Sequence, residues 1–304
     1  MCKKINRFFP MLMICYIGGA FSLGGILLEK NAPVWASLVM SQMLILVPVL
    51  LFAVVQKINI IKCLPYQKFR LSDVLLSLVF GYLLLPLIQL INMVSMTFTT
   101  NRIQESTIAL SQYSFLVQLL LMAVTPAFVE EFVFRGMFFH SYRKNGVLPA
   151  AILSGAIFGI VHMNINQFLY ACVLGFIFAM LVEATGSMYT SMAAHFAINS
   201  YSIIIMKLMP SAVEKNAEAG LDAVPAAGMV AAVIMILVLA IGCSALAFCV
   251  YRMLARRNYT WEVIKEDVRG GLKAKNGEKF ITLPLLITII LCVLYMIVTE
   301  YFVY

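Results

Sequence analysis

The chain has 304 residues, of which 62% are hydrophobic and only 12% are charged, and its formal net charge is +8. Soluble domains contain about half apolar and about a quarter charged residues, so this composition excludes an ordinary soluble protein. The apolar residues occur in long runs, and about 20 of them in a helix cross the hydrocarbon core of a bilayer. The seven cysteines are scattered singly and indicate neither a disulfide framework nor a thiolate metal site. The chain is therefore predicted to be an all-α, polytopic integral membrane protein.

Nine candidate spans follow one another along the chain, which predicts a helical transmembrane bundle of about eight or nine spans with a polar cavity inside the membrane. The chain is divided into N-terminal helices (1–112), a core (113–206) and C-terminal loops with two helices (207–304). We find no internal repeat and no sizeable soluble domain. The spans cover roughly residues 9–28, 33–55, 73–97, 113–141, 147–163, 168–185, 187–206, 225–251 and 280–302.

The lysines and arginines between the spans set the predicted orientation. If the N-terminus lies in the cytoplasm, 17 of these residues fall inside and only 4 fall outside, as the positive-inside rule requires. The four outer residues are Lys30, Arg102, Lys207 and Lys215. Membrane topology thus explains the basic excess, and no nucleic-acid partner is expected. An odd number of spans places Tyr304 outside.

The first span begins after basic residues, as a cleaved signal peptide also does. Its apolar stretch is long for a signal peptide and no convincing small-x-small cleavage site follows, so it is predicted to be an uncleaved anchor. Of the longer connections, the mixed polar loop 207–224 is predicted to be external and the charged loop 252–279 to be cytoplasmic. The protein is expected to be integral to a membrane with its N-terminus in the cytoplasm, and its oligomeric state stays open.

The fourth span contains two adjacent glutamates and an arginine, within residues 129–136. A charged side chain at mid-bilayer is costly, so such residues usually face the bundle interior and serve a function. Glu131 and Arg135 are four residues apart and are predicted to share a helix face as an ion pair. Glu130 points about 100° away and is left for chemistry. The alternative is a structural charge cluster that binds helices together, for which two adjacent acids are poorly suited.

Two further spans carry histidines at a comparable depth. His162 ends the fifth span, and His195 and Asn199, four residues apart, share a face of the seventh. A rise of 1.5 Å per residue puts these groups and Glu130 about 14 to 22 Å from the inner ends of their spans. Each could instead be an interior residue that only forms hydrogen bonds between helices. Together they are predicted to enclose a small cavity that contains water.

Such a set of groups suits hydrolysis of an amide bond. A carboxylate and an imidazole can activate water as a general base, and a second imidazole and a carboxamide can donate hydrogen bonds to an oxyanion. No serine or cysteine at helical spacing indicates a nucleophile. Alternatively, Glu130, His162 and His195 could ligate a divalent metal such as zinc. The single-helix H-E-x-x-H signature is absent, and the sequence leaves both mechanisms open.

At these residues the chain resembles the CPBP family of intramembrane proteases, which includes CAAX prenyl protease type 2 and the bacterial Abi proteins. The resemblance covers about residues 113–206 and includes a segment before the last motif, Thr185-Gly186-Ser187, that is similar to the family's helix opening. The matching motifs, in the family's order, are Glu130-Glu131-x-x-x-Arg135, Phe158-x-x-x-His162 and His195-x-x-x-Asn199.

The resemblance implies an all-helical membrane protease with a cavity reached from the cytoplasmic side. It implies that Glu130 and His162 activate the water and that His195 and Asn199 form the oxyanion hole. The supporting residues would be Glu131, Arg135 and Phe158. The family's metal dependence is unsettled, so zinc and metal-free mechanisms both stay open. The expected partners are the lipid bilayer and a membrane-embedded or lipidated peptide or protein substrate, which includes prenylated C-termini and bacteriocin-type peptides.

This pattern is compatible with three functions. An intramembrane endopeptidase is favoured because a scaffold has no evident need for uncompensated polar groups in lipid. A non-catalytic membrane protein that binds peptides, such as an immunity protein on the same scaffold, is the alternative. A transporter could use the same groups as a proton relay, but transporters often show paired repeats, and none is found here.

Overall fold

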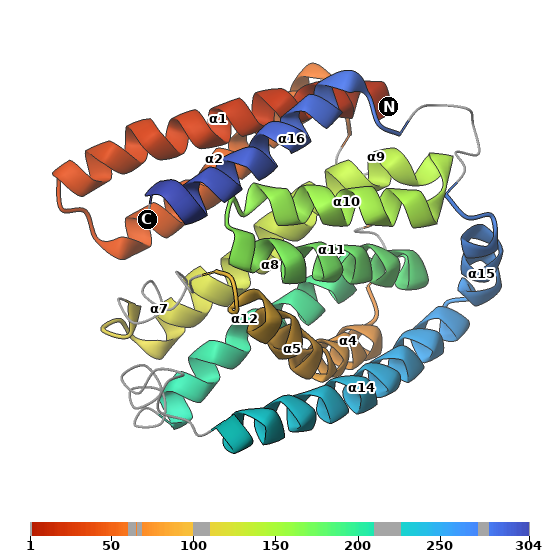
Figure 1. The fold of residues 1–304 in the computed structure, drawn as a ribbon. Helices are drawn as coiled ribbons and strands as arrows, with labels where there is room; N and C mark the ends of the chain where they lie inside the picture. Colours follow the sequence, from red (N-terminus) through yellow and green to blue (C-terminus); the bar gives the residue numbers. More distant parts are fainter. Residues whose placement is uncertain are drawn as a thin grey trace.

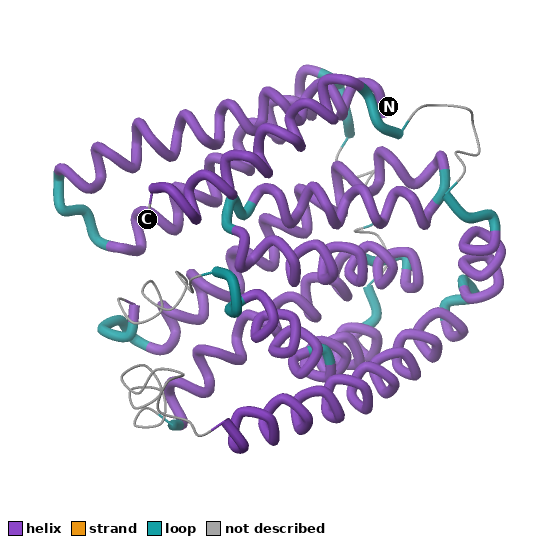
Figure 2. The backbone as a smooth tube through the Cα atoms, viewed as in Figure 1, coloured by secondary structure: helices purple, strands orange, loops and turns teal. Residues whose placement is uncertain are grey.

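The computed structural model describes residues 2–59, 65, 69–99, 110–209, 226–272 and 280–303, and within these ranges the chain is helical with no β-strand (Figure 2). The predicted all-α bundle is therefore confirmed. In chain order the helical elements are α1 (Cys2–Glu29), α2 (Val34–Val55), α4 (Leu71–Leu83), α5 (Leu85–Ser95), α7 (Phe115–Leu119), η1 (Leu120–Val124), α8 (Thr125–Glu130), η2 (Glu131–Phe139), α9 (His140–Tyr142), η3 (Arg143–Asn145), α10 (Val147–Val161), α11 (Ile165–Thr185), α12 (Met188–Leu208), α14 (Ala226–Arg257), α15 (Trp261–Arg269), α16 (Leu283–Val298) and η5 (Thr299–Val303).

All nine predicted spans are helical, and seven helical stretches are long and apolar enough to cross a membrane. The two predicted spans outside this set are α10 and α12. α10 has only 15 residues. α12 has 21 residues, and its run of polar side chains includes Thr190, Ser191, His195 and Asn199. α10 and α12, two of the helices that carry the candidate site, are thus shorter or more polar than those around them.

The N-terminal and C-terminal helices lie together in the fold. α1 and α2 form a hairpin, and α16 packs beside α1 (Figure 1). The third predicted span, residues 73–97, is instead two helices, α4 and α5, which meet at Leu84. Pro86 in the first turn of α5 lacks a backbone N–H and cannot continue the hydrogen bonding of α4, which explains the interruption.

The fourth predicted span forms one helical run from Phe115 to Asn145. Two of its segments, η1 and η2, are π-helical, so their turns are wider than those of an α-helix. Pro126 follows η1 by two residues, and local π adjustments can satisfy the backbone groups that a proline leaves unpaired in a membrane helix. The run ends at Gly146, whose φ of 135° is accessible to glycine. π-Helical turns occur often at functional sites, and here one begins at Glu131.

The core pairs α10 with α11 at very short range. A Cβ atom on Gly155 would lie 2.7 Å from the backbone oxygen of Cys172, and one on Gly175 would lie 2.6 Å from the Cα atom of Gly155. Small residues at such crossings let two membrane helices approach closely. Gly186 follows the end of α11 in the left-handed conformation, with φ of 67°, and Ser187 is the N-cap of α12.

The charged connection predicted at 252–279 is largely helical. α14 continues to Arg257, and α15 follows as a short amphipathic helix that packs against the bundle. Asp267 of α15 accepts a hydrogen bond from the backbone N–H of Val147 at 3.1 Å, and Thr260 donates one to the carbonyl oxygen of Ala184 at 2.6 Å. α15 thus joins the start of α10 to the end of α11. The predicted external loop 207–224 lies outside the described residues after Met209.

Candidate active site

The two adjacent glutamates point into different surroundings. Glu130, the last residue of α8, lines a cavity, whereas Glu131, the first residue of η2, is fully buried behind it. The predicted ion pair is present, because Nη1 of Arg135 lies 3.1 Å from Oε1 of Glu131. Glu131 therefore has a fixed cationic partner, and Glu130 faces the open space.

Arg135 is fully buried and aromatic side chains cover its guanidinium group. Its Cζ atom lies 4.4 Å from the ring centroid of Phe158 and 5.1 Å from that of Phe178. Aromatic faces attract a desolvated cation, and the carboxylate of Glu131 balances its charge. The arginine is held in place by two neighbouring helices, α10 and α11.

His195 on α12 connects the two glutamates. Its Nδ1 lies 3.0 Å from Oε1 of Glu131, and its Nε2 lies 3.8 Å from Oε2 of Glu130. The ring packs against Phe178, with centroids 5.4 Å apart. A carboxylate can only accept a hydrogen bond, so an ionised Glu131 places a proton on Nδ1 and leaves Nε2 directed toward Glu130. The hydrogen-bonding partner of His195 is thus a glutamate from another helix, while Asn199 lies one turn further along the same cavity wall.

His162 follows the last residue of α10 and has a defined tautomer. Its Nδ1 lies 2.8 Å from the carbonyl oxygen of Phe158, and its ring meets the Phe158 ring edge to face at 4.8 Å. The carbonyl oxygen can only accept, so Nδ1 carries the hydrogen. In the neutral ring, Nε2 is then a free hydrogen-bond acceptor.

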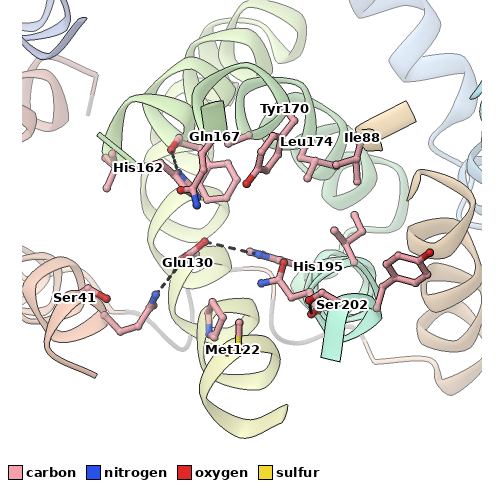
Figure 3. Close-up of a pocket in the computed structure, with 18 of the residues that line it drawn as sticks. Ser41, Ile88, Met122, Glu130, His162, Gln167, Tyr170, Leu174, His195 and Ser202 are labelled. Atoms are coloured by element: carbon pink, nitrogen blue, oxygen red, sulfur yellow. Dashed lines mark hydrogen bonds and ion pairs between the residues drawn. The ribbon is translucent and has the colours of Figure 1, made fainter. Parts of the chain in front are cut away.

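These residues surround one cavity of about 720 Å³. Glu130, His162, His195 and Asn199 all line it, as does Phe158, whereas Glu131 and Arg135 do not. Figure 3 shows Glu130 between His162 on one side and His195 on the other. The structure therefore brings the four predicted catalytic side chains together and places the two supporting charges behind them.

Glu130 is also contacted by a residue that was not predicted as part of the site. Nε2 of Gln42 on α2 donates a hydrogen bond to Oε1 of Glu130 at 3.0 Å. Tyr16 of α1 and Asn92 of α5 also line the cavity. The available signal was the amide of Gln42 itself, because a strongly polar side chain in a membrane helix usually faces the protein interior.

The three candidate metal ligands do not fit a metal in this arrangement. Within the part of the chain that the structure describes, no group of three or more His, Cys, Asp and Glu side chains is arranged to hold a metal ion. Nδ1 of His195 is bonded to Glu131 and Nδ1 of His162 to a backbone carbonyl, which orients both rings and leaves the Nε2 atom of each available. The observed contacts suit acid–base chemistry by the side chains themselves.

Comparison with known proteins finds two similarities in this same region. Residues 112–201 match the family described as type II CAAX prenyl endopeptidase Rce1-like. A 95-residue segment is 31% identical to a curated protein of Bacillus subtilis (strain 168) named "Putative membrane peptidase YdiL", and it covers 31% of this chain and 38% of that relative. The chain thus matches well under half of the curated relative's length. No solved structure matches the chain.

Proposed function

Since the chain belongs to the CPBP/CAAX protease family through residues 112–201, we propose that it is an intramembrane endopeptidase that hydrolyses peptide bonds with a water activated by side chains. The observation that carries this proposal is the placement of Glu130. Its carboxylate faces the cavity between two imidazoles, while the adjacent Glu131 is bound to Arg135 behind the cavity wall.

Glu130 acts as the general base, and the free Nε2 of His162 accepts a hydrogen bond that orients the water. On the other side of Glu130, His195 is oriented by its bond to Glu131, in the way that a carboxylate orients the histidine of a catalytic triad. With Nδ1 held by Glu131, a protonated His195 donates from Nε2 into the cavity. Asn199 supplies a second donor for the developing oxyanion.

The reaction proceeds through a tetrahedral intermediate. Glu130 takes a proton from the water as the water oxygen bonds to the carbonyl carbon, and the carbonyl electrons move onto the oxygen that His195 and Asn199 stabilise. Collapse of the intermediate breaks the C–N bond. The proton on Glu130 passes to the leaving nitrogen, so the carboxylate is restored and the products are an amine and a carboxylic acid.

The proposed substrate is a membrane-associated peptide or protein, embedded or lipidated, that enters the cavity from within the bilayer. The cavity offers both kinds of surface such a substrate needs. Apolar side chains such as Leu174 and Ile88 line it beside polar ones such as Gln167 and Ser202 (Figure 3). We place the protein in the cytoplasmic membrane of a bacterial cell, with its N-terminus in the cytoplasm.

The test is cleavage of membrane-peptide reporters in proteoliposomes by the wild type and by Glu130→Gln. Loss of a general base reduces the rate by about 10²- to 10⁴-fold, so the variant should show little or no turnover while it remains folded. The matched control is Glu262→Gln, which changes an exposed glutamate on α15 and should keep wild-type activity. Equal turnover by wild type and Glu130→Gln would remove Glu130 from the mechanism.

Metal removal tests the acid–base mechanism separately. Treatment with a chelator should leave the turnover of the wild type unchanged, because in the described part of the chain no three His, Cys, Asp or Glu side chains are grouped to hold a metal ion. Activity that a chelator removes and zinc restores would contradict this mechanism and would assign Glu130, His162 and His195 as ligands in a rearranged site.

A further inference from the structure

One end of the bundle gathers the starts and ends of many helices. Asn6 of α1 accepts a hydrogen bond from Tyr142 of α9 at 2.6 Å and donates one to Phe280 just before α16 at 2.8 Å. Asp73 of α4 contacts Asn258 and Arg257 at the end of α14. In Figure 1 the N-terminus and α15 lie at this side of the molecule, and α7 lies at the opposite side.

This end, here called the basic end, carries most of the positive charge. The structure describes 15 lysines and arginines, of which 12 lie at the basic end, only Lys30 and Lys207 lie at the opposite end, and Arg135 lies between. The twelve are Lys3, Lys4, Arg7, Lys57, Arg70, Arg143, Lys144, Arg252, Arg256, Arg257, Lys265 and Arg269. Under the positive-inside rule the basic end faces the cytoplasm.

The cavity lies toward the other end. α10 starts at the basic end but lines the cavity only from Phe158, and α12 lines it only from His195. α11 runs the opposite way and contributes only residues up to Leu174, while α5 lines the cavity and α4 does not. At 1.5 Å per residue, His162 lies about 22 Å from the start of α10. This is beyond the middle of a hydrocarbon core of about 30 Å.

Buried aromatic rings separate the cavity from the basic end. The ring of Phe134, which lines the cavity, stacks on Phe138 at 6.0 Å, and Phe138 contacts Phe9 at 5.9 Å and Tyr142 at 6.5 Å. All four side chains are fully buried. By contrast, two polar lining residues on the other side, Gln89 and Ser202, are exposed. The cavity is therefore closed toward the basic end and open in the opposite half.

From the charge distribution, the position of the cavity and the aromatic layer, we infer that the site is reached from the outer half of the membrane. Its substrate is a peptide segment that sits in the outer leaflet or on the extracytoplasmic surface. This inference rests on the proposed function, because it assumes that the site binds a substrate. It differs from the cytoplasmic access that the family resemblance implies. A prenylated C-terminus on the cytoplasmic surface would not reach Glu130 in this arrangement.

The test is cysteine accessibility in bacterial spheroplasts and in inside-out membrane vesicles, read with a membrane-impermeant maleimide above the wild-type background. Ser202→Cys reports on the cavity mouth, Lys144→Cys on the basic end and Lys207→Cys on the opposite end. We expect Ser202→Cys and Lys207→Cys to be labelled in spheroplasts and to lose that labelling in inside-out vesicles. Lys144→Cys should show the reverse. Gln89→Cys on α5 provides a second report on the mouth if Ser202→Cys does not fold.

Labelling does not depend on catalysis. The labelling test can therefore overturn outer access while the proposed hydrolase function stands, and the cleavage test can fail while outer access stands. Labelling of both mouth variants only in inside-out vesicles would overturn the inference. So would labelling of Lys207→Cys from outside while both mouth variants react from neither side, because the cavity would then be closed to outer water. Labelling of Lys144→Cys in spheroplasts would show that the basic end faces outward and would equally overturn it.

Discussion

Glu130 and Glu131 are neighbours in the chain, yet they belong to two regions that differ in water access and in partners. Glu130 lines the cavity and is contacted by a neutral amide, Gln42, and by His195 at 3.8 Å. Glu131 lies in a fully buried layer with Arg135 and bonds Nδ1 of His195 at 3.0 Å. One carboxylate can exchange protons with water, and the other is fixed by charge.

This contrast shows how one helical run can hold both the carboxylate that we propose as the reactive group and the charges that support it. A buried charge is costly unless it is paired, so the layer behind the cavity pairs every charge it holds. A reactive carboxylate needs the opposite, namely access to water and partners that do not neutralise it. His195 joins the two regions, because one ring nitrogen bonds the buried layer and the other faces the cavity.

Outside the cavity, removal of one partner of the buried Glu131–Arg135 pair should cause the greatest loss of stability. Arg135→Met leaves Glu131 buried without a cation, and removal of one partner of a buried pair costs about 3 to 5 kcal/mol. The double variant Glu131→Gln/Arg135→Met replaces both charges and should recover most of that loss. Unfolding of the detergent-purified proteins by heat or by SDS measures both. If the single and double variants were equally unstable, the pair would not be the reason for the burial of Arg135.

The fold could be predicted from sequence because its determinants are local. Runs of about 20 apolar residues leave a helix as the only spanning structure, since lipid offers the backbone no hydrogen bonds. The break between α4 and α5 was not predicted, although Pro86 marks it. The close approach of α10 and α11 follows from Gly155 and Gly175, but it depends on which helices become neighbours, and one sequence does not show that.

The site was partly predictable, because one of its contacts joins residues that are close in sequence. The spacing of Glu131 and Arg135 within one helix predicted their pairing, because both lie on the same segment. The contact between Glu131 and His195 joins residues 64 positions apart, and the contact of Gln42 joins residues 88 apart. Both arise only when α2, α8, η2 and α12 pack together. Spacing along the chain predicts a shared depth for some of these groups, but it does not show which side chains touch.

A smaller effect is expected from Glu131→Gln, which neutralises only the buried acid. Loss of a hydrogen bond to a charged group costs about 1.5 to 3 kcal/mol, or roughly a ten- to hundredfold fall in kcat at about 1.4 kcal/mol per tenfold. The assay uses only protein that remains monodisperse, because Arg135 also loses its partner. Since Glu131 acts through His195, adding Glu131→Gln to His195→Ala should lower activity no further. A further large loss would show a separate role for Glu131.

The smallest predicted effect concerns Gln42, which lies on α2, outside residues 112–201 that match the Rce1-like family. Gln42→Leu removes the donor to Oε1 of Glu130 while it keeps a side chain of similar size. Water in the cavity can replace part of that bond, so kcat should fall by roughly tenfold, the low end expected for a hydrogen bond to a charged group. KM should change little, because Gln42 holds the base rather than the substrate.

The matched control is Ser41→Ala on the same helix. Its hydroxyl lines the cavity but donates to the carbonyl of Leu38, so this variant should turn over like the wild type. Equal kcat values for Gln42→Leu and Ser41→Ala would mean that the matched segment positions Glu130 without help from α2. A fall in kcat confined to Gln42→Leu would make the N-terminal helices part of the site, because the alignment of Glu130 would then depend on a side chain from α2.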